Sequence, residues 1–292
     1  MNEQETSNNE KVTEAQAPQP TEENVVNANN NEKYVLYADI MGFKERVMRT
    51  RHEDLKKELK GLREELDKEL RSYLDKEIYK PERKTIKAQI SFFSDSILIV
   101  EENTEFGFEC ISRAAESLMI ISCGHKFPIK GAIAKGEFTY EKEEQLFFGQ
   151  AIIDAFLLQE EVHYYGIVAH HTMEEDIKKY SNGTESFFSR TGGRQWIHPY
   201  IRSLIPLKKG KTNHYHLACY LSGIELYTDE EIIENCNGGY CDLEKIYGTV
   251  SGTPRIYVDN TLQVLKDDLC LYIETRKEQG TVEFPLEATP FQ

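Results

Sequence analysis

The order of apolar segments between residues 34 and 169 limits the folds open to this chain more than any other feature. Short β-type runs alternate with helical patterns in the order β, α, β-hairpin, α, β, α, β. The hairpin consists of residues 89–93 and 96–100, whose arms are separated only by Ser94 and Asp95. Such a short connection joins antiparallel strands, because parallel strands need a crossover of a dozen or more residues. The sequence therefore predicts an α+β fold, with helices on one face of a mainly antiparallel sheet.

Helical and β-type patterns can be placed along most of the chain. The strongest helical pattern spans about residues 49–78, where one apolar stripe is formed by leucines at steps of three and four: Leu55, Leu59, Leu62, Leu66, Leu70 and Leu74. Shorter helical patterns cover residues 104–124, 148–161, 173–180 and 253–275. Further β-type segments cover residues 34–38, 128–137, 164–169 and 214–221, and residues 181–196 are typical of a loop.

The N-terminal segment and the overall charge exclude some roles. The first 32 residues contain no aromatic side chain and carry seven glutamates against one lysine. Such a segment cannot bury enough apolar surface to offset the entropy lost on ordering, so residues 1–32 are predicted to be a disordered tail. The whole chain has 50 acidic and 35 basic side chains, a net charge of −15. We expect no nucleic acid as a partner, because binding its backbone needs clustered lysines and arginines.

Hydropathy and cysteine spacing bear on where the protein is located in the cell and on whether it binds zinc. The sequence has no run of about 18 apolar residues that could span a membrane, and its N-terminus lacks the basic and apolar parts of a secretory signal. We therefore expect a cytoplasmic protein with no membrane partner. The six cysteines form no CxxC pair, so reduced thiols are expected rather than a zinc site.

Asp39 and Asp95 are the residues most suggestive of chemistry. Asp39 closes a β-type segment ahead of a turn that contains Gly42, and Asp95 lies in the hairpin turn. If the first strand pairs with the hairpin, both carboxylates lie at one rim of the sheet. Two carboxylates there suit Mg²⁺ or Mn²⁺ bound jointly with a substrate phosphate, and residues 40–44 offer backbone amides at the start of a helix. Each aspartate could also serve only its own turn, since aspartate is common in turns.

Four segments, in this order along the chain, favour the metal site: YADIMGFK, SFFSDSILI, PIKGAIAKGEF and FFGQAIIDAFLLQE. Together they resemble the class III nucleotidyl cyclases, and within that family they look most like the pyrimidine cyclases of bacterial Pycsar antiphage systems. The resemblance covers residues 34 to about 170 well and the remainder loosely. It implies a ferredoxin-like, palm-type fold, with a cyclase catalytic core at residues 33–175 and C-terminal strands and a helix at residues 176–292 that complete the domain.

The resemblance implies roles for the residues around the two aspartates. Asp39 and Asp95 would be catalytic and would hold two Mn²⁺ or Mg²⁺ ions, with the backbone carbonyl of Ile40 as a further ligand. The backbone amides that line the triphosphate would belong to the turn that follows, namely Gly42, Phe43 and Lys44. The reaction would be attack of the ribose 3′-oxygen on the α-phosphorus, with pyrophosphate as the leaving group.

Departures from the purine cyclases bear on the substrate. Ser91 stands where those enzymes carry a base-reading lysine, and Leu146 stands where they carry a base-reading aspartate. Loss of this donor–acceptor pair favours a pyrimidine nucleoside triphosphate, UTP or CTP, without choosing between them. Leu36 and Tyr37 are candidate linings of the base pocket, with ordinary core packing as the alternative.

The positions that hold phosphates in the family are only partly matched. Its helix asparagine and arginine fall on Ile153 and Leu157. Its late phosphate-binding lysine is matched by Lys208 and Lys209, for which a basic turn between strands is an equal alternative. Three other basic residues could substitute: Arg46, Lys130 and Lys135.

The resemblance also implies partners. The family's site forms between two subunits, which implies a homodimer, and we expect the helix at 52–78 and the region after residue 200 to contribute to it. A cyclic pyrimidine monophosphate would activate a separate effector, not bound by this chain, in antiphage defence. Two alternatives stay open, a degenerate cyclase fold that only binds a nucleotide or partner, and other metal-dependent phosphoryl chemistry. A diguanylate-cyclase-like enzyme fits less well, because its GG[DE]EF hairpin is replaced by FFSDS.

Overall fold

The computed structural model describes residues 31–74, 89–141, 143–180, 188–191, 194–197, 200–218, 243 and 251–279. The chain divides into two compact units, Met1–Asn31 and Glu32–Gln292, and the described residues belong to the second unit apart from Asn31. The tail predicted at residues 1–32 thus lies almost entirely outside the described residues. Within the described ranges, every helix is too short or too polar to span a lipid bilayer.

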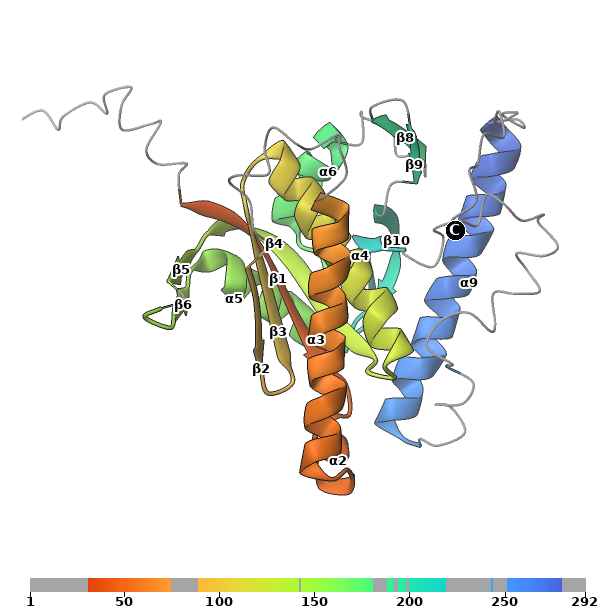
Figure 1. Ribbon diagram of the computed structural model, residues 1–292. Coiled ribbons are helices and arrows are strands. Elements are labelled where there is room, and N and C mark those ends of the chain that lie inside the picture. Colours follow the sequence, from red (N-terminus) through yellow and green to blue (C-terminus); the bar gives the residue numbers. More distant parts are fainter. Residues whose placement is uncertain are drawn as a thin grey trace, which may run out of the picture. The chain divides into compact units, whose positions relative to one another are not determined.

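The main sheet has seven strands in the order β10-β11-β7-β4-β1-β3-β2 (Figure 1). Its strands are β1 (Glu32–Ile40), β2 (Gln89–Phe93), β3 (Ser96–Glu102), β4 (Ile129–Glu137), β7 (Ile167–Ala169), β10 (Tyr200–Pro206) and β11 (Lys211–Leu217). Neighbouring strands are antiparallel except β4 and β7, which run parallel. The predicted α+β fold with a mainly antiparallel sheet is confirmed, and β1 lies inside the sheet between β3 and β4.

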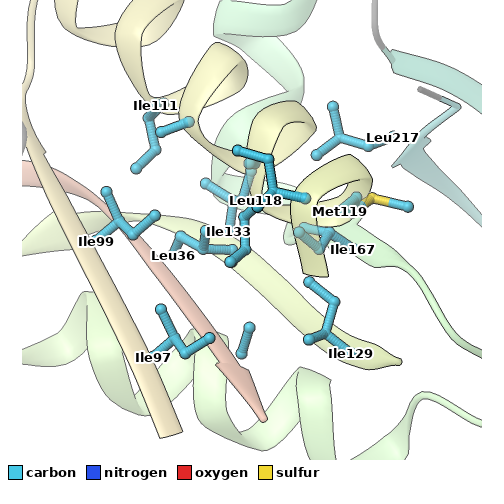
Figure 2. Packing of buried hydrophobic residues seen from close by; sticks show 14 of the residues in the cluster. Leu36, Ile97, Ile99, Ile111, Leu118, Met119, Ile129, Ile133, Ile167 and Leu217 are labelled. Carbon is cyan, nitrogen blue, oxygen red and sulfur yellow. The ribbon is translucent and has the colours of Figure 1, made fainter. Parts of the chain in front are cut away.

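One face of the sheet is covered by two helices, α3 (His52–Leu74) and α4 (Glu105–Gly124). The leucine stripe of α3 is buried in the core at four positions: Leu55, Leu62, Leu66 and Leu70. Figure 2 shows Leu36, Ile97 and Ile99 of the sheet together with Ile111 and Leu118 of α4 in the same cluster. Burial of this apolar surface is the main force that holds the helices on the sheet.

The opposite face of the sheet is covered by α5 (Gln150–Glu161), so the prediction that helices lie on one face only is wrong. Ala132 and Ala134 of β4 pack against Ala155 of α5, and these small side chains let the helix approach the strands closely. Periodicity shows that a helix has an apolar side, but it does not say which face of a sheet that side will meet.

The remaining elements of the described chain are short except α9, which has 27 residues. They are α2 (Phe43–Arg49), β5 (Thr139–Glu141), β6 (Leu146–Phe148), η2 (His171–Met173), α6 (Glu174–Tyr180), β8 (Phe188–Thr191), β9 (Arg194–Ile197) and α9 (Thr253–Gln279). The hairpin β5–β6 and the strand β10 were not predicted, and the hairpin β8–β9 replaces part of the loop expected at residues 181–196. The strands β5, β6, β8 and β9 have only three or four residues each, so the partner strand defines them more than the local pattern does.

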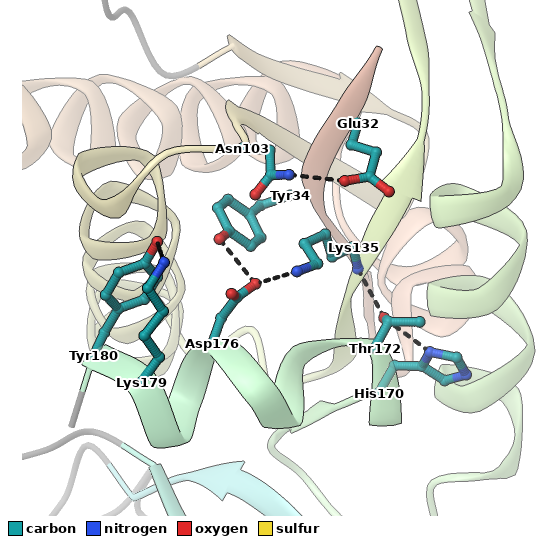
Figure 3. A network of polar contacts seen from close by, with 9 residues as sticks. All are labelled: Glu32, Tyr34, Asn103, Lys135, His170, Thr172, Asp176, Lys179 and Tyr180. Atoms are coloured by element: carbon teal, nitrogen blue, oxygen red, sulfur yellow. Dashed lines mark hydrogen bonds and ion pairs between the residues drawn. The ribbon is translucent and has the colours of Figure 1, made fainter. Parts of the chain in front are cut away.

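A polar network fixes α6 to the sheet near the start of β1 (Figure 3). The hydroxyl of Tyr34 donates to a carboxylate oxygen of Asp176 over 3.0 Å, and Nζ of Lys135 lies 2.6 Å from the same oxygen. Burial, more than the charge of Asp176, raises the pKa of Tyr34 far above its ordinary value. Lys135 is therefore engaged at the opposite end of β1 from Asp39.

Cysteine chemistry differs from the expectation at one position. Cys123, near the end of α4, is disulfide-bonded, which contradicts the expected reduced thiol, whereas Cys110 and Cys270 are thiols. Spacing along the chain does not reveal such a bond, because only folding brings two distant cysteines within reach of each other.

Candidate functional site

Asp39 and Asp95 come together at the end of β1. Asp39 stands directly opposite Ser96, the first residue of β3, and Asp95 lies in the turn just before it. The backbone N–H of Ile40 donates to the carbonyl oxygen of Asp95 over 2.8 Å, which ties the end of β1 to this turn. Ser94 has a φ of 56°, a left-handed conformation that closes so short a connection. The two aspartates thus share one rim of the sheet, close enough for the charge of Asp95 to raise the pKa of Asp39.

Each carboxylate oxygen of Asp39 accepts one hydrogen bond. Oγ of Ser96 donates to Oδ1 over 2.9 Å, and Nε2 of Gln159, from α5, donates to Oδ2 over 3.0 Å. Burial raises the pKa of Asp39 above its ordinary value, while the hydrogen bond from Ser96 acts in the opposite direction. A carboxylate oxygen can accept more than one contact, so each oxygen keeps capacity for a cation or a water molecule.

Lys130 brings a positive charge to the same face. It stands directly opposite Asp39 in the β1–β4 pair and is only 5% exposed. Its Nζ lies 5.8 Å from the ring centroid of Tyr257, at the start of α9. Burial lowers the pKa of Lys130, whereas the charges of Glu160 and Asp39 raise it. The rim therefore holds two carboxylates and a largely buried ammonium group.

Arg46, Lys130 and Lys135 were the three basic residues that could substitute for the family's phosphate-binding residues. They have different surroundings in the structure. Lys135 is bound to a carboxylate at the far end of β1. Arg46 donates to Glu58 over 3.0 Å and to the carbonyl oxygen of Lys126 over 2.7 Å, so it holds α2 against its neighbours. Of these three, Lys130 is the one beside the two aspartates.

Lys208 and Lys209 lie between β10 and β11, next to the C-terminal end of α5. The backbone N–H of Lys208 donates to the carbonyl oxygen of Glu161 over 2.8 Å, and its Nζ pairs with a carboxylate oxygen of Glu160 at 3.2 Å. Lys208 is close enough for its charge to lower the pKa of Lys130. The structure thus brings Lys208 toward the rim, with Lys209 exposed on the same turn.

The turn after β1 leads directly into α2. Gly42 has a φ of 73°, and a Cβ placed there would meet no atom within 4 Å. The left-handed backbone, and not a lack of room, is therefore what favours glycine here. The N–H of Arg46 donates to the carbonyl oxygen of Gly42, which is the first hydrogen bond of α2. The amides of Phe43 and Lys44 come before Arg46 in the first turn, where the helix itself supplies no acceptor for an N–H group. These amides belong to residues that follow Asp39 closely along the chain.

An apolar cavity of about 460 Å³ lies beside the rim. Its lining comes from β1, β6 and α5: Tyr37, Phe147, Phe148, Gly149, Gln150, Ile152, Ile153 and Phe156. The rings of Tyr37 and Phe156 meet edge to face at a centroid distance of 5.5 Å. Tyr37 precedes Asp39 by two positions on one strand, so both side chains lie on the same face. The cavity is large enough for a small ligand, and its lining residue Tyr37 is hydrogen-bonded to Ser96, the neighbour of Asp95 in the chain.

Ser91, Leu146 and Leu36 occupy three different positions. Oγ of Ser91 lies 2.9 Å from the hydroxyl oxygen of Tyr140, whose ring packs on Phe147 of the cavity wall at 4.8 Å. Leu146 is exposed on β6. Leu36 is fully buried against α3 and α4, on the other face of β1, so its predicted place in the base pocket does not hold. Successive side chains of a strand point to opposite faces, which separates Leu36 from Tyr37.

The donors at the rim fit a hard divalent cation shared with a ligand. Asp39 and Asp95 supply carboxylate oxygens, and Ile40 supplies a backbone carbonyl at the end of β1. Among the described residues, no group of three or more His, Cys, Asp or Glu side chains could hold a metal by itself. Such a cation would therefore complete its coordination with oxygens of a bound phosphate and with water, as Mg²⁺ commonly does.

Two neighbours of Asp39, Ser96 and Gln159, had no part in the sequence prediction. Ser96 could have been found, because pairing the first strand with the hairpin places it opposite Asp39. Gln159 could not, because its contact depends on the side of the sheet that α5 covers and on how the helix is rotated there.

Comparisons with known proteins give similar structures but no family. No protein-family model and no curated protein matches the chain. The adenylyl cyclase CyaB from P. aeruginosa is 13% identical with a TM-score of 0.42, over 64% of this chain and 93% of that chain. The guanylate cyclase domain of RhGC from Catenaria anguillulae, in complex with GTP, is 12% identical with a TM-score of 0.43, over 65% and 97%. The guanylyl cyclase Cya2 is 10% identical with a TM-score of 0.34, over 64% and 90%.

Proposed function

We propose that this chain is a nucleotidyl cyclase that converts a pyrimidine nucleoside triphosphate, UTP or CTP, into its 3′,5′-cyclic monophosphate and pyrophosphate. One observation carries the proposal: Asp39 and Asp95, far apart in the sequence, share a rim with the buried Lys130. Carboxylates for divalent cations and an ammonium group for phosphate oxygens are what transfer at a triphosphate requires. The four cyclase-like segments of the sequence support the same reaction.

The proposed reaction needs positioning more than covalent participation by the protein. The ribose 3′-oxygen forms a bond to the α-phosphorus, the bond from that phosphorus to pyrophosphate breaks, and the hydroxyl proton is released to solvent. Two Mg²⁺ or Mn²⁺ ions, held by Asp39, Asp95 and the carbonyl of Ile40, would lower the pKa of the hydroxyl group and neutralise the triphosphate. The donors on both oxygens of Asp39 hold this carboxylate in one direction before substrate arrives.

We assign the triphosphate to the cationic side of the rim. Lys130 and Lys208 would contact phosphate oxygens, and the first-turn amides of Gly42, Phe43 and Lys44 would add donors at the start of α2. Lys130 is suited to this because it is held beside Asp39 and has lost most of its contact with water, which strengthens its interaction with an anion. Lys209, which is exposed on the same turn as Lys208, would contribute to the approach of the substrate.

We assign the base to the cavity lined by Tyr37, Phe147 and Phe156. Aromatic and aliphatic walls suit a planar base, and Ser91 lies behind the wall with its hydroxyl bonded to Tyr140. Leucine at position 146 offers no charge to a purine edge. The substitutions at Ser91 and Leu146, relative to the purine cyclases, are what favours a pyrimidine.

A second candidate function is nucleotide binding without catalysis. The observation that favours it is the apolar character of Ile153 and Leu157, which are 51% and 56% exposed at the positions matched to the family's helix asparagine and arginine. Without that arginine, charge that develops on the α-phosphoryl group must be met by Lys130 or Lys208. If neither suffices, the site binds a nucleotide and leaves it intact.

We further propose a homodimer that forms through the face of α5 and β6. Large apolar side chains are exposed on these two elements: Leu146, Phe148, Ile153, Phe156 and Leu157. Exposed apolar patches of this kind mark interaction surfaces. We expected the helix at 52–78 to contribute to the dimer. Its described part is less suitable as a dimer surface, because its leucine stripe is already buried against α4 and the sheet.

In the cell, we propose a cytoplasmic enzyme whose cyclic pyrimidine monophosphate acts as a second messenger in antiphage defence. The resemblance to pyrimidine cyclases of Pycsar systems supports this role. The effector would be a separate protein that recognises the product and not this chain.

Incubation with each of the four ribonucleoside triphosphates and Mn²⁺, with products identified by mass, tests the proposed function. Cyclic UMP or cyclic CMP as the main product is the expected result, and Asp267→Asn, an exposed acid on α9, should behave like the wild type. Cyclic AMP or cyclic GMP as the main product would overturn the pyrimidine assignment. No cyclic product under any condition, together with measurable nucleotide binding, would establish the second candidate instead.

A further inference from the structure

The hydroxyl of Ser96 lies between the apolar cavity and the carboxylate of Asp39. Its Oγ is 2.9 Å from Oδ1 of Asp39 and 2.7 Å from the hydroxyl oxygen of Tyr37, which lines the cavity. Ser96 is half-buried in the first position of β3, where the β1–β3 pairing places it directly opposite Asp39. One side chain therefore touches both parts of the proposed site.

Hydrogen-bond chemistry fixes the direction of this contact chain. An ionised carboxylate can only accept, so the single hydrogen of the Ser96 hydroxyl is donated to Asp39. Oγ of Ser96 must then accept from Tyr37, whose own hydrogen is used in that bond. The result is a directed series of donors, from Tyr37 to Ser96 to Asp39, in which a change at the cavity end alters the donor that Asp39 receives.

Gln159 provides an internal comparison. It donates to Oδ2, the other carboxylate oxygen of Asp39, over 3.0 Å, and it is fully buried on α5. Its Nε2 holds Asp39 as closely as Ser96 does, but Gln159 does not line the cavity. The two donors of Asp39 thus differ in one respect, namely that Ser96 alone of the two is bonded to a residue of the cavity wall.

We propose that Ser96 is a positioning residue that couples occupation of the cavity to cation binding at Asp39. The inference rests on the proposed function, since it takes Asp39 as a cation ligand and the cavity as the base site. A ligand that packs on Tyr37 shifts the Tyr37–Ser96 bond, and the direction of Oδ1 shifts with it. Coupling of this kind is reciprocal, so a cavity ligand changes cation affinity by the same factor as the cation changes ligand affinity.

Mn²⁺ binding, measured by electron paramagnetic resonance with and without uridine as the cavity probe, tests the coupling without any turnover. For the wild type we expect uridine to change the Mn²⁺ dissociation constant about fivefold. In Ser96→Ala this change should disappear, whereas Ser96→Thr, which keeps the hydroxyl group, should retain it. Gln159→Met should weaken Mn²⁺ binding and still leave the response to uridine in place.

A double-mutant cycle separates action through Ser96 from direct action of Tyr37 on Asp39. If Tyr37 acts through Ser96, the effects of Tyr37→Phe and Ser96→Ala on Mn²⁺ affinity will not add, while those of Tyr37→Phe and Gln159→Met will add. Additive effects in the first pair, or a uridine response that persists in Ser96→Ala, would overturn the coupling alone. A wild-type protein that binds no Mn²⁺ would overturn the cation site itself, and with it the proposed function.

Discussion

Lys130 of β4 stands directly opposite Asp39 of β1, and both side chains lie on the face of the sheet that α5 covers. The pair is partly withdrawn from water, since Lys130 is buried and Asp39 is half-buried. With Asp95 contributed by the neighbouring hairpin, the rim combines groups for a cation and for an anion within one small space. The chemistry proposed above depends on this juxtaposition.

Replacement of either aspartate by asparagine should abolish cyclisation without loss of the fold. We expect Asp39→Asn and Asp95→Asn each to lower the rate of product formation by about 10²-fold or more, because a neutral amide binds divalent cations poorly. The folded state raises the pKa of Asp39, so its charge costs stability at neutral pH, and Asp39→Asn should leave the melting temperature unchanged or higher. Product mass and thermal denaturation check the two parts, and an active Asp39→Asn protein would contradict the assignment.

Lys130→Met should reduce activity and spare the fold. Methionine has a similar length and no charge, so it removes the proposed contact with phosphate oxygens and relieves the cost of a buried charge. We expect the rate to fall about 10²-fold, with a melting temperature equal to or above that of the wild type. Lys266→Met, at an exposed position on α9, is the matched control. An unchanged rate in Lys130→Met would assign the phosphate contact to another residue.

Glu101→Gln should stabilise the protein at alkaline pH. Glu101 is 3% exposed, and burial, with a smaller effect of the neighbouring Glu102, raises its pKa from 4.5 to about 8. The folded state therefore binds this proton more tightly than the unfolded state, and the charge destabilises folding increasingly between pH 4.5 and pH 8. At pH 9 we expect a gain of about 2–4 kcal/mol in the free energy of unfolding, since a tenfold difference in proton affinity corresponds to about 1.4 kcal/mol.

Denaturant unfolding of Glu101→Gln at pH 5 and pH 9 measures this effect. The gain should be much smaller at pH 5, where Glu101 of the folded wild type is already protonated. Glu64→Gln, on the exposed side of α3, should show no comparable dependence on pH. An equal effect at both pH values would mean that the charge of Glu101 is not what destabilises the fold.

Leu157→Glu should prevent self-association. Leu157 is 56% exposed on α5, outside the lining of the cavity, and a charge there would be buried without a partner in the proposed dimer. We expect the wild type to sediment as a dimer at micromolar concentration and Leu157→Glu to sediment as a monomer with lower activity. Ile120→Glu, 52% exposed on α4, should remain dimeric. A monomeric wild type with full activity would exclude the dimer.

The local pattern of apolar residues was sufficient to predict much of the fold. The leucine stripe at 49–78 predicted a helix that the structure contains as α3, and the two arms around Ser94 and Asp95 form β2 and β3 as predicted. These elements repeat one short-range periodicity over many residues, so neighbouring residues alone define them. The strand that holds Asp39 and the helix that begins near Gly149 were predictable for the same reason.

The sequence by itself determined the α+β class and the hairpin. It also placed Asp39 and Asp95 at chain positions that strand pairing could bring to one rim of the sheet. Only the tertiary structure decided that α5 covers the second face, that Lys130 and not Lys135 or Arg46 stands beside Asp39, and that Leu36 points into the core. It also supplied Ser96 and Gln159 as donors to Asp39. The reason is physical: periodicity reports the environment along one element, whereas these contacts depend on strand register and helix rotation, which are set when separate elements pack together.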